Sequence, residues 1–254
     1  MRANFNDIRH FKGSTARPLT LAKRLRLIEK HLAPGPRRFL DCGCGIGNYV
    51  QALIERLGVD ACGIEYDQET VTLAQLNPVL QGRITQGDLQ AIQSADNQWD
   101  YAMLNEVLEH VGDDRRVLAE VHRILKPRGI LFVFSPNRWF PFETHSVDWK
   151  KSRRRIPNWV PFIPYLPVRV GERFLFYWAR NYWPRELAGK VMAAGFSIIE
   201  RNYVWLTFEN ISGYQPPLIG MIKPALRFAS NRLEKIPFLR RFGASQVLIC
   251  RKEA

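Results

Sequence analysis

The sequence contains no run of 18 apolar residues, although 46% of its 254 residues are hydrophobic. A helix that spans a bilayer needs roughly 20 mostly apolar residues, so we expect no transmembrane helix. Residues 1–10 (MRANFNDIRH) also lack the apolar segment of a secretory signal. These two absences predict a cytoplasmic protein, and the hydrophobic content is sufficient for one sizeable α/β core.

Cysteine is scarce as well. The four cysteines, Cys42, Cys44, Cys62 and Cys250, form no CxxC pair and no regular disulfide pattern. Cysteine in apolar, strand-like runs usually serves as a small hydrophobic residue. The spacing therefore favours a reducing compartment over a disulfide framework.

Acidic residues are few outside the middle of the chain, and the net charge is +13. Residues 1–40 carry ten Lys/Arg against two acidic residues, residues 41–122 carry four against fourteen, and residues 123–254 carry 23 against eight. Basic ends of this kind fit an anionic partner, such as nucleic acid, lipid headgroups or a phosphorylated substrate. A merely solvated basic surface is the alternative.

The first half of the chain alternates short apolar runs with segments of helical periodicity. This rhythm predicts an α/β fold with a doubly wound, mostly parallel sheet of seven strands, preceded by an amphipathic N-terminal helix. We expect the last strand, residues 246–251, to close the sheet edge. The other expected strands are 38–40, 61–64, 83–86, 100–104, 130–134 and 196–200, and the expected helices are 17–33, 48–57, 69–76, 113–125 and 184–194.

Two stretches interrupt this rhythm after residue 135. Residues 136–182 are rich in proline and aromatic residues and contain the basic run KKSRRR at 150–155, which suggests a lid or substrate-binding insertion. Residues 204–243 form a second insertion, in which apolar and aromatic residues alternate with Lys and Arg. Such segments lie in a membrane interface or pack on the sheet edge and shape a pocket. We treat residues 1–254 as one domain that carries both insertions.

A glycine-rich loop follows the first expected strand and precedes a helix. Gly43, Gly45 and Gly47 let the backbone approach a ligand, because glycine has no Cβ, and the following helix N-terminus favours electronegative groups. Asp41, two residues before the first glycine, would attract a ligand amine and repel a pyrophosphate. The loop therefore favours a nucleoside with a cationic group over a nicotinamide dinucleotide.

Further polar residues follow the next strands, at the edge where ligands bind to a doubly wound sheet. Glu65 ends the second strand and can accept both hydroxyls of a ribose. Asp88 follows the third strand and could reach an adenine amino group, with Leu89 against the ring, although a turn role would also explain an aspartate there. Asn105 ends the fourth strand. The convergence of these residues on one edge indicates a nucleoside site.

These features together resemble the class I S-adenosylmethionine-dependent methyltransferases. The resemblance covers residues 35–135 and, more weakly, residues 183–200. It implies a Rossmann-like methyltransferase fold and S-adenosyl-L-methionine as the cofactor. The segments that carry it are FLDCGCGIGNYV, CGIEYD, GDL, WDYAMLNEVLEHVGD, ILKPRGILFVFSPN and WPRELAGKVMAAGF.

The family pattern also implies roles for individual residues. The aspartate and glycines of the loop would hold the methionine moiety, the residues after the second strand the ribose, and those after the third strand the adenine. The residues after the fourth strand would border the sulfonium. The cofactor-binding residues implied in this way are Asp41, Gly43, Gly45, Gly47, Glu65, Tyr66, Asp88, Leu89, Asn105 and Glu106.

Two histidines are candidate catalytic residues, because an oxygen nucleophile must lose its proton. His145 lies in a polar loop after the fifth strand, on the ligand edge, and His110 follows the fourth strand. Glu106, Glu109 and His110 resemble the metal-binding Glu-x-x-Glu-His of small-RNA 2′-O-methyltransferases and of a ubiquinone-pathway O-methyltransferase. A divalent metal could bind there with His145 as a further ligand. The same pattern fits a cofactor wall at a helix start, and we predict no metal.

The sequence thus predicts a methyltransferase that O-methylates a large or membrane-associated acceptor, such as a lipid-linked glycan or a prenylated ring. Its basic, aromatic insertions predict peripheral contact with an anionic membrane at the cytoplasmic face. An RNA methyltransferase that holds phosphates on the same surface is the second hypothesis. A nicotinamide-dependent oxidoreductase or a non-catalytic nucleotide-binding module would be a different class.

Overall fold

The computed structural model describes residues 18–209 and 217–253, with side chains in the second range from residue 222 onward. The expectations for residues 1–10 and for Arg17, the first residue of the expected N-terminal helix, lie outside these ranges.

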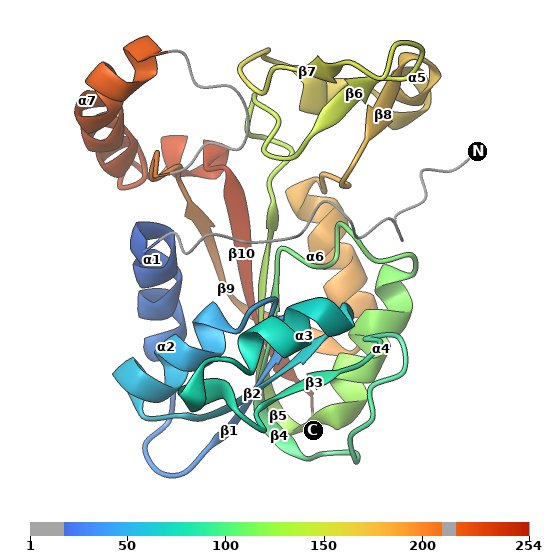
Figure 1. Ribbon diagram of the computed structural model, residues 1–254, viewed down its shortest axis with the longest axis vertical. Helices are drawn as coiled ribbons and strands as arrows, with labels where there is room; N and C mark the ends of the chain where they lie inside the picture. The colour runs from blue at the N-terminus through green and yellow to red at the C-terminus, as the bar shows by residue number, and fades with distance from the viewer. Residues whose placement is uncertain (1–17, 210–216, 254) are drawn as a thin grey trace.

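A seven-stranded sheet forms the centre of the molecule, in the order β3-β2-β1-β4-β5-β10-β9 (Figure 1). Every strand runs in the same direction except β10, which pairs antiparallel with both of its neighbours. The predicted mostly parallel sheet of seven strands is therefore confirmed. Its strands are β1 (Arg38–Cys42), β2 (Asp60–Glu65), β3 (Ile84–Gln86), β4 (Trp99–Asn105), β5 (Leu125–Pro136), β9 (Phe196–Val204) and β10 (Ser245–Lys252).

The prediction that the last strand closes the sheet edge was wrong. β10 lies between β5 and β9, and β9 forms the edge. The six consecutive residues from Ser245 to Cys250 are all buried, whereas in β9 only the end residues Phe196 and Val204 are buried. A continuous apolar run is typical of a strand covered on both faces, so the central position of β10 agrees with its sequence.

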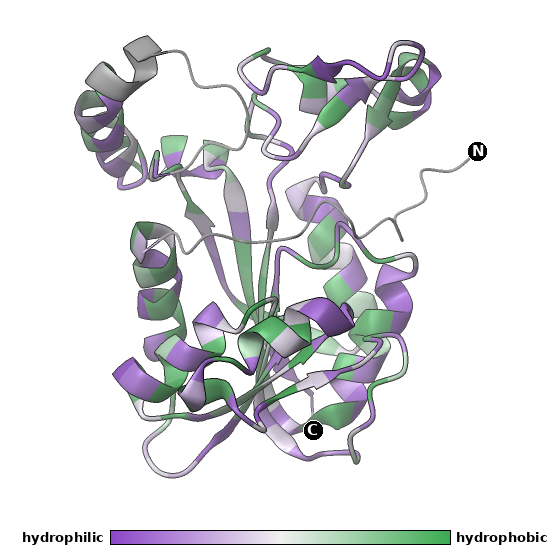
Figure 2. Ribbon diagram, in the orientation of Figure 1, coloured by the Kyte–Doolittle hydropathy of each residue, from purple (hydrophilic) through white to green (hydrophobic). Residues whose placement is uncertain are grey.

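Helices cover both faces of this sheet. Each packs through a narrow apolar stripe, such as Leu21, Leu25 and Ile28 on the first helix. Figure 2 shows the corresponding bands of hydrophobic and hydrophilic residues along these helices. One face carries α1 (Pro18–Glu29), α2 (Asn48–Leu57), α3 (Gln68–Ala74) and the 3₁₀ turn η2 (Pro78–Leu80), and the other carries α4 (Asp114–Ile124) and α6 (Pro184–Ala193).

Local sequence explains where the helices beside the sheet edge begin. Gly47 directly precedes α2 and has a left-handed φ of 80°, and Gly58, with a φ of 64°, follows its last turn. The Asp113 carboxylate accepts the backbone N–H groups of Arg115 and Arg116 at 3.1 Å, which caps α4.

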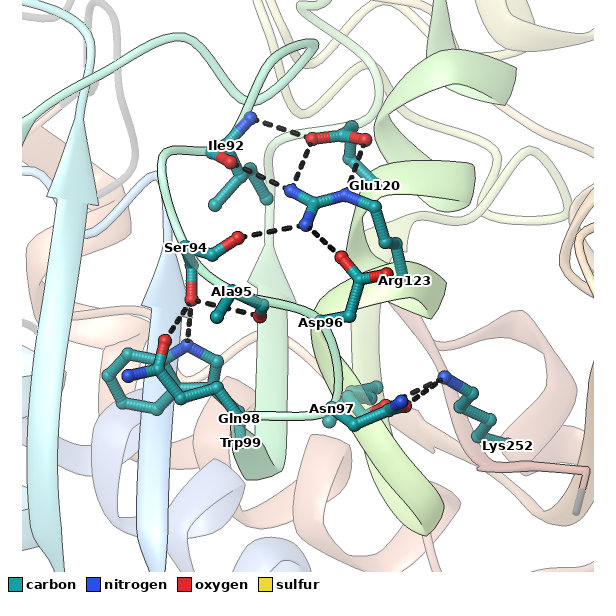
Figure 3. A network of polar contacts seen from close by, with 11 residues as sticks. Ile92, Ser94, Ala95, Asp96, Asn97, Gln98, Trp99, Glu120, Arg123 and Lys252 are labelled. Atoms are coloured by element: carbon teal, nitrogen blue, oxygen red, sulfur yellow. Dashed lines mark hydrogen bonds and ion pairs between the residues drawn. The ribbon is translucent and has the colours of Figure 1, made fainter.

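The loop between β3 and β4 is held by a polar network centred on Arg123 of α4 (Figure 3). The guanidinium donates to the carbonyl oxygens of Ile92 and Ser94, both at 2.8 Å. It also pairs with Asp96 at 2.6 Å and with Glu120 at 2.9 Å. Glu120 in turn accepts the N–H of Ile92 at 2.9 Å. This irregular loop is thus fixed by side chains of α4.

The first insertion contains a small antiparallel sheet in the order β7-β6-β8. It has its own core of four buried residues, Val147, Ile156, Ile163 and Leu175. The sequence did not predict these strands, because they are too short to show an alternating pattern. The regular elements are β6 (Val147–Trp149), β7 (Arg155–Ile156), the 3₁₀ turn η3 (Ile163–Tyr165), α5 (Val168–Phe174) and β8 (Leu175–Tyr177).

The second insertion contains α7 (Pro217–Leu233) and the 3₁₀ turn η4 (Leu239–Phe242). Both insertions leave the sheet where parallel strands end, and Figure 1 shows them at the same end of the molecule. The Asn137 side chain joins them by donating to the carbonyl oxygens of Arg241 and Gly243 at 2.8 and 2.7 Å. Within the described residues, every helix is too short or too polar to cross a bilayer.

Candidate functional site

The glycine loop turns sharply between β1 and α2. Gly43, Gly45 and Gly47 all have positive φ, at 82°, 55° and 80°. A Cβ added at Gly43 would lie 2.6 Å from Val107, but one added at Gly45 would meet no atom within 4 Å. The first glycine is therefore required for packing, whereas the second leaves open space beside its backbone, as the approach of a ligand requires.

Asp41 lies in β1, directly before this loop, and is almost completely buried. Its Oδ1 atom has no hydrogen-bond partner among the residues that the structure describes. Burial, together with the nearby charge of Glu65, raises the pKa of the carboxyl to about 8. A buried acceptor without a partner is costly, so Asp41 fits a site that a ligand amine completes.

Glu65 ends β2 as predicted and holds the loop from the opposite strand. Its Oε2 accepts the N–H of Gly45 at 2.9 Å, and its Oε1 accepts the N–H groups of Tyr66 and Asp67 at 2.9 and 3.1 Å. A carboxylate offers about four acceptor positions. Three are used within the protein, so one is left for a ligand hydroxyl. The Tyr66 side chain is exposed at 55%.

Asp88 follows β3 and is exposed. Its Oδ1 accepts the backbone N–H of Gln90 at 2.8 Å, which is the turn role that the sequence analysis left open. Its neighbour Leu89 is buried in the core on the face of the sheet that α4 and α6 cover. Within the described residues, both hydrogen bonds that the Asp88 side chain accepts from Gln90 end on Oδ1. The other carboxylate oxygen is left for a ligand, so the turn role does not exclude cofactor binding.

Asn105, the last residue of β4, and Glu106, which follows it, are both bound by Arg24 of α1. The guanidinium donates to the Asn105 amide oxygen and forms an ion pair with Glu106. Ser245 of β10 also donates to Glu106, at 2.9 Å. The sequence analysis missed Arg24, since a basic residue on an amphipathic helix gives no sign of a partner 82 residues away.

The structure brings three of the candidate ligand and catalytic residues together. Ligand atoms of Glu109, His110 and His145 all lie within 4.8 Å of one another, and the two imidazole centroids are 5.0 Å apart. Burial, with the charge of His145, lowers the pKa of His110 to about 3. Burial, with the charge of Glu106, raises the pKa of Glu109 well above its ordinary value. Glu106 itself is not part of this cluster.

A buried carboxylate supports the loop that carries His145. Glu143 accepts the backbone N–H groups of Thr144 and His145 at 3.2 and 3.3 Å, and the Asn181 amide donates to both of its oxygens at 3.0 and 2.9 Å. Neither Glu143 nor Asn181 was among the site residues predicted from the sequence. Proximity of Glu143 to His145 in the chain was the one signal that could have found it.

The fold and this edge define a Rossmann-like enzyme that binds a nucleoside carrying an amine. A family model described as a methyltransferase domain matches residues 40–133. A ubiquinone biosynthesis O-methyltransferase of Paraburkholderia phymatum is 32% identical over 178 residues, which are 68% of this chain and 69% of that protein. The chain belongs to the class I S-adenosylmethionine-dependent methyltransferases.

Other relatives carry related names. The chain is 27% identical over 196 residues to a ubiquinone biosynthesis O-methyltransferase of Azorhizobium caulinodans, covering 76% of this chain and 66% of that protein. It is 24% identical over 224 residues to a demethylmenaquinone methyltransferase of Lysinibacillus sphaericus, covering 86% and 80%. The chain spans between half and two thirds of the length of the first O-methyltransferases it matches, 66% and 52%.

A solved structure supports the fold. An S-adenosylmethionine-dependent methyltransferase from Methanosarcina mazei matches with a TM-score of 0.57 and 17% identity, over 89% of this chain and 97% of that one. At this identity the likeness establishes the architecture alone, in agreement with the predicted Rossmann-like methyltransferase fold.

Proposed function

We propose that the protein transfers a methyl group to a ring oxygen of a quinone-related acceptor that carries a hydrophobic chain. The names of its relatives support this class of acceptor. The structural observation that carries the proposal is the pair of imidazoles at 5.0 Å, His110 and His145, on the edge that also holds Asn105. A prenylated ring was one acceptor predicted from the sequence, and these relatives favour it over a lipid-linked glycan and over RNA.

S-adenosyl-L-methionine, when bound, supplies a methyl group already activated on a sulfonium. The unpaired, buried Asp41 would bind its amine, and the open backbone at Gly45 would let its carboxylate approach the N-terminus of α2. The adenosine and sulfonium ends would extend along the ends of the neighbouring strands. Gly43 and Gly47 would hold the methionine moiety together with Asp41 and Gly45. The residues assigned to the adenosine and the sulfonium are Glu65, Tyr66, Asp88, Leu89, Asn105 and Glu106.

His145 would act as the general base that removes the proton of the attacking ring hydroxyl. His110, with its pKa lowered to about 3, is neutral at every physiological pH. It would hold the His145 ring in position instead of competing for the proton. Glu143 would keep the loop in place through the N–H of His145, at 3.3 Å. The first insertion, residues 136–182, would act as the lid that excludes water from this reaction.

The sequence-based prediction of no metal has a direct test. Glu109, His110 and His145 offer the donor atoms that a divalent cation takes. Titration with Zn²⁺ and Mg²⁺ would be followed by calorimetry in the protein and in a His110→Ala variant. We expect no heat of saturable metal binding in either protein. Stoichiometric binding that the variant loses would overturn the prediction and turn the histidine pair into a metal site.

The first insertion presents aromatic residues beside its basic run. Trp149, Trp159 and Phe174 are half or more exposed, and the basic residues at 150–155 are exposed around them. Such a surface fits peripheral contact with an anionic membrane, where a prenylated acceptor would reside. Cosedimentation with phosphatidylglycerol vesicles but not with phosphatidylcholine vesicles is expected. Equal binding to both, or preference for RNA over vesicles, would contradict this.

The acceptor itself is best found by mass spectrometry. A bacterial lipid extract, an RNA fraction and a glycan fraction would each be incubated with the protein and methyl-labelled cofactor. We expect a labelled product, heavier by one methylene, in the lipid-soluble fraction only, and none with an Asp41→Ala variant as the control. Label confined to the RNA or glycan fraction would refute the proposed acceptor without refuting methyl transfer.

A further inference from the structure

Arg24 of α1 is buried at the edge of the cofactor site. Its guanidinium binds Asn105 and Glu106, donates to Ser245 at 3.2 Å, and lies over the Phe134 ring at 5.1 Å. We infer that Arg24 is a positioning residue for methyl transfer, because it fixes the turn after β4 against the glycine loop and so sets cofactor affinity. This inference rests on the proposed cofactor site.

The turn that Arg24 holds has a backbone conformation that needs support. Glu106 has a φ of 57°, in the left-handed region that residues other than glycine rarely adopt. Such a conformation persists where the surrounding structure enforces it. The N–H of Glu106 donates to the carbonyl of Phe134 at 2.9 Å, while its carboxylate is held by Arg24 and Ser245. Removing Arg24 would leave the partly buried carboxylate without this ion pair, and the turn would relax.

The same turn is in direct contact with the glycine loop. Val107, the next residue, packs so closely on Gly43 that a Cβ there would lie 2.6 Å from its side chain. A movement of Asn105 and Glu106 therefore displaces Val107 and changes the loop that would bind the methionine moiety. Arg24 would therefore act on the cofactor through these packed groups, as a positioning residue and not as a catalytic one.

Residues of the second insertion hold helix α1 in place. Glu209 accepts the N–H groups of Leu19 and Thr20 at 2.6 and 3.0 Å, which caps the helix, and Lys23 forms an ion pair with Glu234. These contacts fix α1, and so they fix the position of Arg24 beside the turn after β4. Lys23 is a matched control, since it is the adjacent basic residue, forms one ion pair, and makes no bond to the turn after β4.

The first test is the affinity for S-adenosylhomocysteine, measured by calorimetry with the full-length protein. We expect Arg24→Gln to raise Kd by about tenfold, because Arg24 is buried and its loss removes the cation from a partly buried ion pair. Lys23→Gln is expected to stay within about twofold of the unsubstituted protein. An unchanged Kd in Arg24→Gln, or an equal loss in Lys23→Gln, would overturn the inference.

A double-mutant cycle separates positioning from a general loss of stability. If Arg24 acts through the Glu106 carboxylate, the double variant R24Q/E106Q should bind S-adenosylhomocysteine with the Kd of E106Q alone, within about twofold. Additive losses would refute the inference. If R24Q alone does not fold, the double variant, in which position 106 no longer carries a charge that needs a cation, is compared with E106Q instead. Absence of binding by the unsubstituted protein is a separate result, and it would refute the proposed cofactor site itself.

Discussion

Replacing Asp41 by asparagine should stabilise the protein without cofactor and abolish cofactor binding. Asp41 has a folded-state pKa of about 8, against 3.8 for the ordinary carboxyl, because it is buried and lies near Glu65. The unfolded chain therefore loses this proton at a lower pH than the folded chain does. The free energy of unfolding must fall as pH rises from 3.8 towards 8, since the folded state resists ionisation over this window.

The size of the effect follows from this pKa difference. One pKa unit corresponds to about 1.36 kcal/mol, so the cost is about 2 kcal/mol at pH 5, about 4 kcal/mol at pH 7 and nearly 6 kcal/mol above pH 8. The Asp41→Asn side chain cannot ionise and does not incur this cost. The variant should therefore be more stable than the unsubstituted protein by about these amounts, less the cost of burying the amide.

Urea unfolding at pH 5, 7 and 9 without cofactor measures this difference. The gap in the free energy of unfolding should widen from pH 5 to pH 9. Saturating S-adenosylhomocysteine should then stabilise the unsubstituted protein by mass action and leave the variant unchanged. A gap that does not depend on pH, or a variant that is less stable at pH 7, would refute the argument that Asp41 is an unpaired acid completed by a ligand.

Three further predictions concern other parts of the site. His145→Gln should lower kcat by about 10²- to 10⁴-fold, with the Kd for S-adenosylhomocysteine unchanged by calorimetry; full turnover would remove this residue as the base. Gly47→Ala should lower the free energy of unfolding by about 3 kcal/mol, because its Cβ would lie 2.6 Å from Leu80 at a φ of 80°. Gly58→Ala, with positive φ but open space, should cost about 1 kcal/mol in the same urea experiment; equal losses would contradict the packing argument. Arg123→Gln should accelerate hydrogen exchange in the loop between β3 and β4 and leave kcat for saturating cofactor unchanged; unchanged exchange would show that the loop holds itself.

The sequence predicted the parts of the fold that depend on local pattern. The helix over residues 48–57 has the predicted bounds, since glycines stand at both of its ends. Asp41, Glu65 and Asn105 lie at the carboxyl ends of their strands, because parallel strands place such residues at one edge. The error on β10 concerned order in the sheet, which depends on pairing between distant segments and leaves only a weak local signal.

The parts of the site that the sequence did not predict are contacts across the chain. Arg24 and Glu106 are 82 residues apart, and Asn181 lies 38 residues from Glu143. Neither pair has a periodicity or spacing that marks it. Polar residues that were correctly predicted at the ligand edge of the sheet also form hydrogen bonds within the protein. Glu65, for example, holds the glycine loop by accepting the N–H of Gly45. Asp41 differs from Glu65 in that it is buried and has a carboxylate oxygen without a partner among the described residues, and residue type alone does not show this difference.

The ion pairs between distant parts of the chain also show which basic residues are available to bind an anionic partner. Arg24 from the basic N-terminal block binds Glu106 of the acidic middle, and Lys190 from the basic C-terminal block binds buried Asp114. Part of the positive charge therefore neutralises acidic residues in the middle of the chain and is not available to a partner. The run at 150–155 is different, because its side chains are exposed. An anionic partner should therefore depend on this run. Replacing its basic residues by glutamine should abolish binding to phosphatidylglycerol vesicles, whereas Lys190→Gln, which removes one positive charge elsewhere, should leave it unchanged; equal losses would mean that net charge alone attracts the membrane.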